Sequence, residues 1–245
     1  MTLLLRTVGF ACAFCAVWIL PAGLRAETNL ITLEKNELRL LASPFAAANG
    51  NPLAVTALIK PATGGVQVFV YSQTNFGGLG GYRSATYNAS GWSVSSDTNT
   101  PIARGDGFWL RNSTTNPIPV TFTGTLSTAL AITNRIVFPN AAGGPATIGY
   151  PYLAAVAITN LNLTNDIRPY VTGTVLYVFA PDIYDGSQGS GYRMFFYDAD
   201  GSFGGGWQDA DDPGQPTDYV LTPMEGFWIL SRGQTQIVWR AVAPP

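Results

Sequence analysis

The chain of 245 residues contains no histidine and only two cysteines, Cys12 and Cys15. Both cysteines lie in an apolar segment at the start of the chain, so the remainder has no thiol for a disulfide, a metal site or nucleophilic catalysis. A serine triad also lacks its usual base, since only a Ser–Lys pair remains. These absences rule out a large part of enzyme chemistry, and we expect a protein that is not an enzyme and has no catalytic residues.

Charged residues are also scarce, at 11% of the chain, and the formal net charge is −2. Arg6 and Arg25 are the basic residues of the first 26 positions, which contain no acid, so the remainder carries a net charge of about −4. No cluster of basic residues follows. The charge balance therefore argues against a nucleic-acid partner.

Long apolar runs are missing apart from residues 8–20. This run is shorter than the roughly 20 residues that a membrane-spanning helix needs. Arg6 precedes this run, Pro21 ends it, and small residues up to Ala26 permit cleavage. We expect a signal peptide over residues 1–26, with a retained anchor as the alternative. The mature chain is then secreted to the extracellular space or the cell surface, without a membrane span.

Glycine, threonine, asparagine and aromatic residues are abundant instead, and one stretch occurs twice. Residues 105–110 (GDGFWL) return as residues 224–229 (MEGFWI), and upstream positions also have counterparts. The offset between matched positions grows from 107 at Pro44 and Pro151 to 119 at Gly107 and Gly226, as loop insertions would produce. The sequence therefore predicts two β repeats, over residues 27–126 and 127–245.

The fold class that we expect is all-β, with two tandem, internally duplicated antiparallel repeats that resemble sandwiches or barrels and carry short helices in loops. Residues 65–71 alternate between two apolar faces and predict a strand covered on both sides. Residues 28–41 predict a hairpin, which residues 136–150 match in the second repeat. Residues 53–59 predict a short helix, with Asn51 as its cap and Pro52 at its first position.

Several short motifs resemble those of secreted proteins with paired β repeats from planctomycetes and verrucomicrobia. The matching residues in the first copy are 40–44, 68–71, Gly91-Trp92, 107–109 and 122–124; in the second copy they are 149–151, 176–178, Gly206-Trp207, 226–228 and Trp239. The resemblance covers nearly all of the mature chain. It implies an exported surface or extracellular protein, and it brings no established activity.

An acidic loop in the second repeat is a candidate calcium site. Asp198 and Asp200 stand two residues apart before Gly201-Ser202, a spacing that calcium loops use because alternate oxygens then face one centre. The glutamate that closes an EF-hand loop is missing, and Asp-Gly is also a common turn. A solvated turn is therefore the alternative to calcium bound by Asp198, Asp200 and Ser202, and no other cofactor is expected.

Aromatic residues are the second group of candidate functional residues. The rings that recur in both repeats predict packing positions, and these are Trp92, Phe108, Trp109, Trp207, Phe227 and Trp228. Sugar stacking is the alternative for the tryptophans and for tyrosines such as Tyr82. Tyr184 and Tyr219 occur in one copy only, so they are better candidates for binding a ligand such as a sugar. Asp106 and Glu225, which precede the repeated Gly-Phe-Trp, are interpreted as marking the start of a strand.

The pattern as a whole favours an exported, non-enzymatic structural or adhesive protein of the cell surface or extracellular matrix. Its expected partners are surface or matrix components, including polysaccharide or further copies of itself, contacted through loops and edge strands. The alternative is a carbohydrate-binding module, supported by calcium, that uses loops of the second repeat. A glycosidase is third, because loop aspartates occur but nothing places two of them across a sugar ring.

Overall fold

The computed structural model describes residues 25–72, 80–93, 96–138, 143–163, 174–184, 190–232 and 236–244. The predicted signal peptide lies outside these residues except for Arg25 and Ala26, which begin strand β1 (Arg25–Leu33). Every strand pairing is antiparallel, and the predicted all-β class is confirmed. Within the described ranges, no helix has the length and apolar character needed to cross a membrane.

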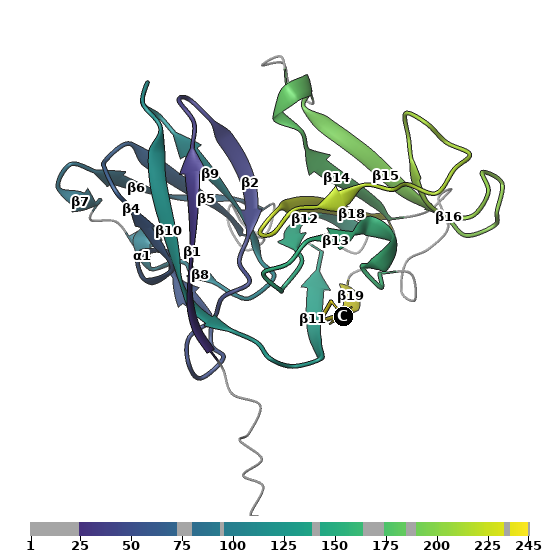
Figure 1. Ribbon diagram of the computed structural model, residues 1–245, viewed down its shortest axis with the longest axis horizontal. Helices are drawn as coiled ribbons and strands as arrows, with labels where there is room; N and C mark the ends of the chain where they lie inside the picture. The colour runs from purple at the N-terminus through teal and green to yellow at the C-terminus, as the bar shows by residue number, and fades with distance from the viewer. Residues whose placement is uncertain are drawn as a thin grey trace, which may run out of the picture.

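The first half of the chain, defined here as strands β1 to β10, forms three small sheets (Figure 1). The five-stranded sheet has the order β2 (Leu38–Ala42), β9 (Gly107–Asn112), β5 (Val66–Ser72), β6 (Gly81–Asn88) and β7 (Gly91–Trp92). β1, β10 (Ile118–Leu126) and β4 (Ile59–Pro61) form the opposite sheet, and β3 (Leu53–Ala54) pairs with β8 (Pro101–Ile102).

The second half, strands β11 to β19, has a matching arrangement. Its five-stranded sheet has the order β12 (Gly143–Gly149), β18 (Gly226–Arg232), β14 (Val175–Phe179), β15 (Tyr192–Asp198) and β16 (Gly206–Asp209). β11 (Ala131–Val137) pairs with β19 (Gln236–Val242), and β13 (Val156–Ala157) pairs with β17 (Val220–Leu221). The strand orders correspond sheet by sheet, although β4 has no counterpart among the described strands; the tandem duplication itself stays a prediction.

Each half has its own apolar core between its sheets. In the first half, alternate residues Val66, Val68 and Val70 of β5 point inward and are buried against β10 residues such as Phe122. In the second half, Leu176 and Val178 of β14 are buried in the corresponding core. The alternation predicted for residues 65–71 is therefore confirmed, and both halves are sandwich-like.

The hairpin predicted over residues 28–41 is wrong. A turn does occur at the expected place, where the Glu37 amide donates to the Glu34 carbonyl. However, β1 pairs with β10 while β2 pairs with β9, so the two strands belong to different sheets. In the second half, β11 and β12 are separated in the same way. Local pattern shows the turn but does not show which distant strand each arm meets.

The helix predicted over residues 53–59 is shorter and begins later. The only α-helical turn of the described residues is α1 (Val55–Leu58), flanked by β3 and β4, and Ala54 precedes it without any side-chain cap. The cap predicted at Asn51-Pro52 is therefore wrong. Single turns of 3₁₀ helix lie at η2 (Ser96–Asn99), η3 (Ile158–Asn160) and η5 (Pro181–Ile183).

The two halves meet where the five-stranded sheets bring β2 and β9 against β12 and β18 (Figure 1). The Ala42 amide donates to the Met224 carbonyl at 2.8 Å, and the Gly149 amide donates to the Gly105 carbonyl at 2.9 Å. Gly226 permits this approach, since a Cβ there would lie 2.6 Å from the Leu41 carbonyl oxygen. The repeated glycine of Gly-Phe-Trp thus serves the contact between halves.

Aromatic rings form a further part of this contact. The central aromatic cluster consists of Leu38, Leu40, Phe69, Trp109, Phe179, Tyr192 and Trp228 and draws on both halves. Trp109 packs edge-to-face on Phe179 with ring centroids 5.0 Å apart, and Trp228 packs on Tyr71 at 5.5 Å. Such pairs add about 0.5–1.5 kcal/mol each beyond area burial. The inter-half contact is therefore both a backbone crossing and an apolar interface.

We predict that Gly226→Val lowers the free energy of unfolding by about 3 kcal/mol, because its side chain collides with backbone that two sheets hold in place. Urea unfolding followed by tryptophan fluorescence measures the loss. Gly201→Ala is the control, since a Cβ at Gly201 meets nothing within 4 Å and only its left-handed φ of 77° opposes substitution. That strain costs about 1 kcal/mol. Equal losses in the two variants contradict the assigned role of Gly226.

Candidate functional site

Two hollows bring side chains from both halves together, and the first is aromatic. The aromatic groove has a volume of about 490 Å³ and is lined by Asn36, Leu38, Phe69, Tyr82, Trp109, Arg111 and Tyr184. Six of these residues come from the first half, and Tyr184 comes from the second, directly after η5. The groove is therefore completed only when the halves are packed together.

Strand alternation places the rings in the groove. Phe69 stands between the buried Val68 and Val70 of β5, and Trp109 stands between the buried Phe108 and Leu110 of β9. Since successive side chains of a strand point to opposite faces, Phe69 and Trp109 point away from the core of the first half. They line the groove and belong to the central aromatic cluster.

Tyr82 is fixed in the groove by hydrogen bonding and ring contacts. Trp109 Nε1 donates to the Tyr82 hydroxyl oxygen at 3.1 Å, and the Tyr82 ring packs edge-to-face on Phe69 and Tyr71. Burial raises the pKa of Tyr82 to about 12, although the hydrogen bond from Trp109 acts in the opposite direction. The phenol is thus neutral at physiological pH and offers its proton to a ligand acceptor.

Of the two tyrosines predicted to bind a ligand, only Tyr184 lies in the groove. Its side chain is 47% exposed, and its ring lies 5.6 Å from that of Phe179. Tyr219 lies elsewhere: its ring packs on Phe195 at 5.2 Å, and its hydroxyl donates to Glu225 Oε1 at 2.8 Å. Burial and the Glu225 carboxylate both raise the pKa of Tyr219. Tyr184 therefore lines the aromatic groove, and Tyr219 is not among its lining residues.

The acidic loop of the second half forms a turn whose own amides use the carboxylates. Asp198 Oδ2 accepts hydrogen bonds from the Phe203 and Gly205 amides, both at 2.8 Å, and Asp200 Oδ1 accepts one from the Ser202 amide at 3.0 Å. Hydrogen bonds from Ser202 lower the pKa of the exposed Asp200. Within the described ranges, no three acidic residues gather as a metal would require. Calcium at Asp198, Asp200 and Ser202 stays a prediction.

The recurring aromatic residues divide into two groups. Phe108 and Trp92 pack with the core of the first half, and Trp207 and Phe227 are buried in the core of the second. Trp109 and Trp228 instead face the other half. Repetition in the sequence does not separate these two groups. The signal that the sequence did offer is residues 65–71, whose apolar residues on both faces indicate that side chains also pack on the face away from the core.

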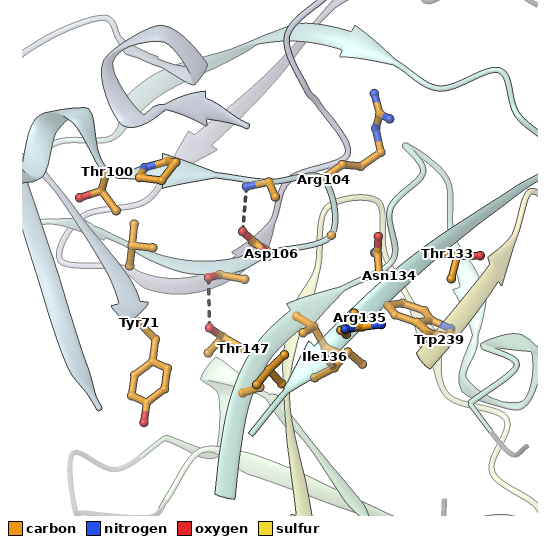
Figure 2. Close-up of a pocket in the computed structure, with 18 of the residues that line it drawn as sticks. Tyr71, Thr100, Arg104, Asp106, Thr133, Asn134, Arg135, Ile136, Thr147 and Trp239 are labelled. Carbon is orange, nitrogen blue, oxygen red and sulfur yellow. Dashed lines mark hydrogen bonds between the residues drawn. The ribbon is translucent and has the colours of Figure 1, made fainter. Parts of the chain in front are cut away.

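The second hollow is the inter-half cleft, defined by the turn at residues 103–107, by β11 and β12, and by neighbouring side chains of the first half. Its volume is about 660 Å³, and its lining includes Arg83. Asp106, Arg135 and Thr147, which also line it, are labelled in Figure 2. Thr147 Oγ1 donates to the Gly107 carbonyl at 3.1 Å. The side chain of Arg104 extends away from Asp106 and Thr147, and its guanidinium donates to the Pro44 and Thr125 carbonyls.

Asp106 lies at the cleft and closes the turn that precedes β9. Its Oδ2 accepts a hydrogen bond from the Ala103 amide at 2.8 Å, as Figure 2 shows. Glu225 closes the corresponding turn before β18, where its Oε2 accepts a hydrogen bond from the Thr222 amide at 2.7 Å. Burial raises the pKa of Asp106 to about 6, against an ordinary value of 3.8. Both acids thus stand at a strand start.

Comparison with protein families, with curated proteins and with solved structures finds no match for this chain. The similarity to paired β-repeat proteins of planctomycetes and verrucomicrobia stays a prediction from short motifs. The functional argument therefore rests on the two hollows and on the residues that line them.

We predict that Asp106 makes the free energy of unfolding depend on pH. Its folded pKa near 6 exceeds the ordinary value of 3.8, so ionisation opposes folding. The stability contributed by this group is full below pH 3.8 and is lost as the pH rises through 6. Asp106→Asn keeps an oxygen acceptor for the Ala103 amide but cannot ionise, so its stability relative to wild type should rise from pH 4 to pH 7. Urea unfolding across this range measures the difference, and parallel pH profiles contradict the prediction.

Proposed function

We propose that this protein is an exported, non-enzymatic adhesive protein of the cell surface or extracellular matrix, and that it attaches by binding polysaccharide in the aromatic groove. The observation that carries the proposal is the set of four rings from both halves, Phe69, Tyr82, Trp109 and Tyr184, around one open hollow. Binding sites commonly combine such apolar walls with a few polar groups that fix orientation.

The composition of the groove suits a sugar chain. Rings present flat apolar faces to the C–H groups of a pyranose, while tyrosine hydroxyls reach its oxygens. Tyr82 and Tyr184 are the exposed rings, at 41% and 47% of their full surface. Arg111 and Asn36 stand at the polar rim and supply hydrogen-bond donors. The net charge of −2 makes a nucleic acid, whose bases also stack on rings, the less suitable partner.

Self-association is a second candidate, supported by the outer face of the β11–β19 sheet. Val137, Val238 and Val242 are each more than a third exposed on this face, and β11 pairs only with β19 among the described strands. Edge strands with exposed apolar residues can pair with other chains. Sizing chromatography and electron microscopy of the mature protein test this candidate; a persistent monomer that binds no cell-surface material contradicts both adhesive modes.

We predict that Tyr184→Ala weakens polysaccharide binding about tenfold, which corresponds to about 1.4 kcal/mol. An array of immobilised bacterial and plant polysaccharides identifies a binding chain, and calorimetry with its oligosaccharide measures affinity. Phe203→Ala is the matched control, since Phe203 is also an exposed ring, packed on Phe196. The control should stay within twofold of wild type. If the wild-type protein binds no polysaccharide on the array, the proposed function is wrong.

Binding in the groove should not change when calcium is removed. The groove contains no carboxylate among its described lining residues, and Asp198 already accepts two amides in its own loop. The measurement is the same calorimetric titration in EGTA and in millimolar calcium. A tenfold or larger loss of affinity in EGTA instead supports the calcium-supported module predicted from the acidic loop.

A further inference from the structure

The contact between the halves is two-fold symmetric, so each residue at this contact can be compared with its counterpart. The Ala42 amide donates to the Met224 carbonyl, and the Gly149 amide donates to the Gly105 carbonyl. Ala42 and Gly149 occupy corresponding positions at the ends of β2 and β12. Gly105 and Met224 correspond in the turns before β9 and β18. The same two positions thus meet twice with the halves exchanged, as they would at a symmetric dimer interface.

The hydrogen-bonded ring pair of the aromatic groove also has a symmetric counterpart. In the first half, Trp109 donates to the hydroxyl oxygen of Tyr82. In the second half, Tyr192 has the corresponding hydrogen bond with Trp228; burial raises the pKa of Tyr192, and this bond acts in the opposite direction. Because the pair occurs on both sheet faces, packing between the halves accounts for it. A preference for one kind of ligand must therefore come from residues that differ between the two faces.

Arg111 is a position at which the two faces differ. It stands two residues after Trp109 in β9, so its side chain leaves the same face of the sheet, and it lines the aromatic groove. The corresponding residue, two positions after Trp228 in β18, is Leu230. Arg111 is exposed, whereas Leu230 is partly buried. Packing between the halves therefore does not require a cation at this position.

The guanidinium of Arg111 has no counter-ion among the residues that the structure describes. Within those ranges it forms no hydrogen bond or ion pair, and none of the described residues that line the groove is acidic. Two acids of neighbouring segments are engaged elsewhere: Glu37, which precedes β2, pairs with Arg39, and Asp182 of η5 lies 3.9 Å from Arg193. The described lining of the groove is thus positive in a chain whose net charge is −2.

We propose that the aromatic groove binds an acidic polysaccharide, with a carboxylate or sulfate group of the sugar at Arg111. This inference rests on the function proposed above for the groove and narrows it to acidic chains. Successive side chains on one face of a strand lie about 7 Å apart, so one sugar unit can contact the rings while its anionic group contacts Arg111. Arginine suits such a group because its guanidinium can donate two parallel hydrogen bonds to one anion.

Arg111→Leu tests the proposal by installing the residue that occupies the corresponding position of the second half. The matched control is Arg240→Leu, which removes the same charge from an exposed position of β19 that does not line the groove. Circular dichroism and thermal melting establish that both variants fold. If Arg111→Leu does not fold, Arg111→Gln removes the charge while keeping a polar side chain and provides the same comparison.

Calorimetric titration of the mature chain with matched pairs of oligosaccharides measures the preference for acidic sugars. One pair is oligogalacturonate and its methyl ester, and the other is a sulfated galactan oligosaccharide and its desulfated form, so the pairs distinguish carboxylate from sulfate. Wild type should bind at least one acidic member about tenfold more tightly than its neutral form, as a charge-assisted hydrogen bond would give. Arg111→Leu should bring this ratio to within twofold of one, and Arg240→Leu should keep it.

Three results overturn the proposal. The first is a neutral member of each pair that binds wild type as tightly as its acidic form, and the second is a polysaccharide array on which only neutral chains bind. The third is a preference for the acidic member that survives in folded Arg111→Leu or Arg111→Gln. In each case polysaccharide binding that Tyr184→Ala weakens still supports the proposed function, whereas an array without any binding contradicts the function itself.

Discussion

The close backbone contact between the two five-stranded sheets is the constraint on which the other features depend. Gly226 lies against the Leu41 carbonyl and Gly107 lies against the backbone of Thr147, so no side chain separates the strands at either crossing. Because the backbones meet, Trp109 and Trp228 reach rings of the opposite half, and Tyr184 reaches the groove of the first half. Both hollows are therefore products of one interface.

The same interface explains why corresponding positions have different roles. Phe108 and Phe227 pack in the cores of their own halves, while the adjacent tryptophans pack between the halves. At the turns, Met224 inserts its side chain into the first-half core, whereas Gly105 has no side chain and the Asn134 amide lies beside it. The two turns thus share a backbone conformation, but only the turn with Met224 sends a side chain into the core of the other half.

The positions of strands could be predicted from the sequence, but the pairing of distant strands and the grouping of residues into sites could not. The alternation of Val66, Val68 and Val70 identified β5, because side-chain period is a local property. The pairing of β1 with β10 depends on residues about 90 positions apart, which no local turn at Lys35-Asn36 reveals. Tyr184 was predicted as a ligand residue, whereas Phe69, Tyr82 and Trp109 were missed as its neighbours, because their meeting requires the contact between halves.

Amide hydrogen exchange at the crossing tests the central claim most directly. The Ala42 amide donates to Met224 and the Gly149 amide donates to Gly105, and both bonds join the halves. If the halves form one cooperative body, these two amides should exchange as slowly as core amides such as that of Val68, through global unfolding. Exchange of Ala42 and Gly149 orders of magnitude faster than Val68 would show that the halves separate in the native state, and it would contradict a groove and a cleft built between them.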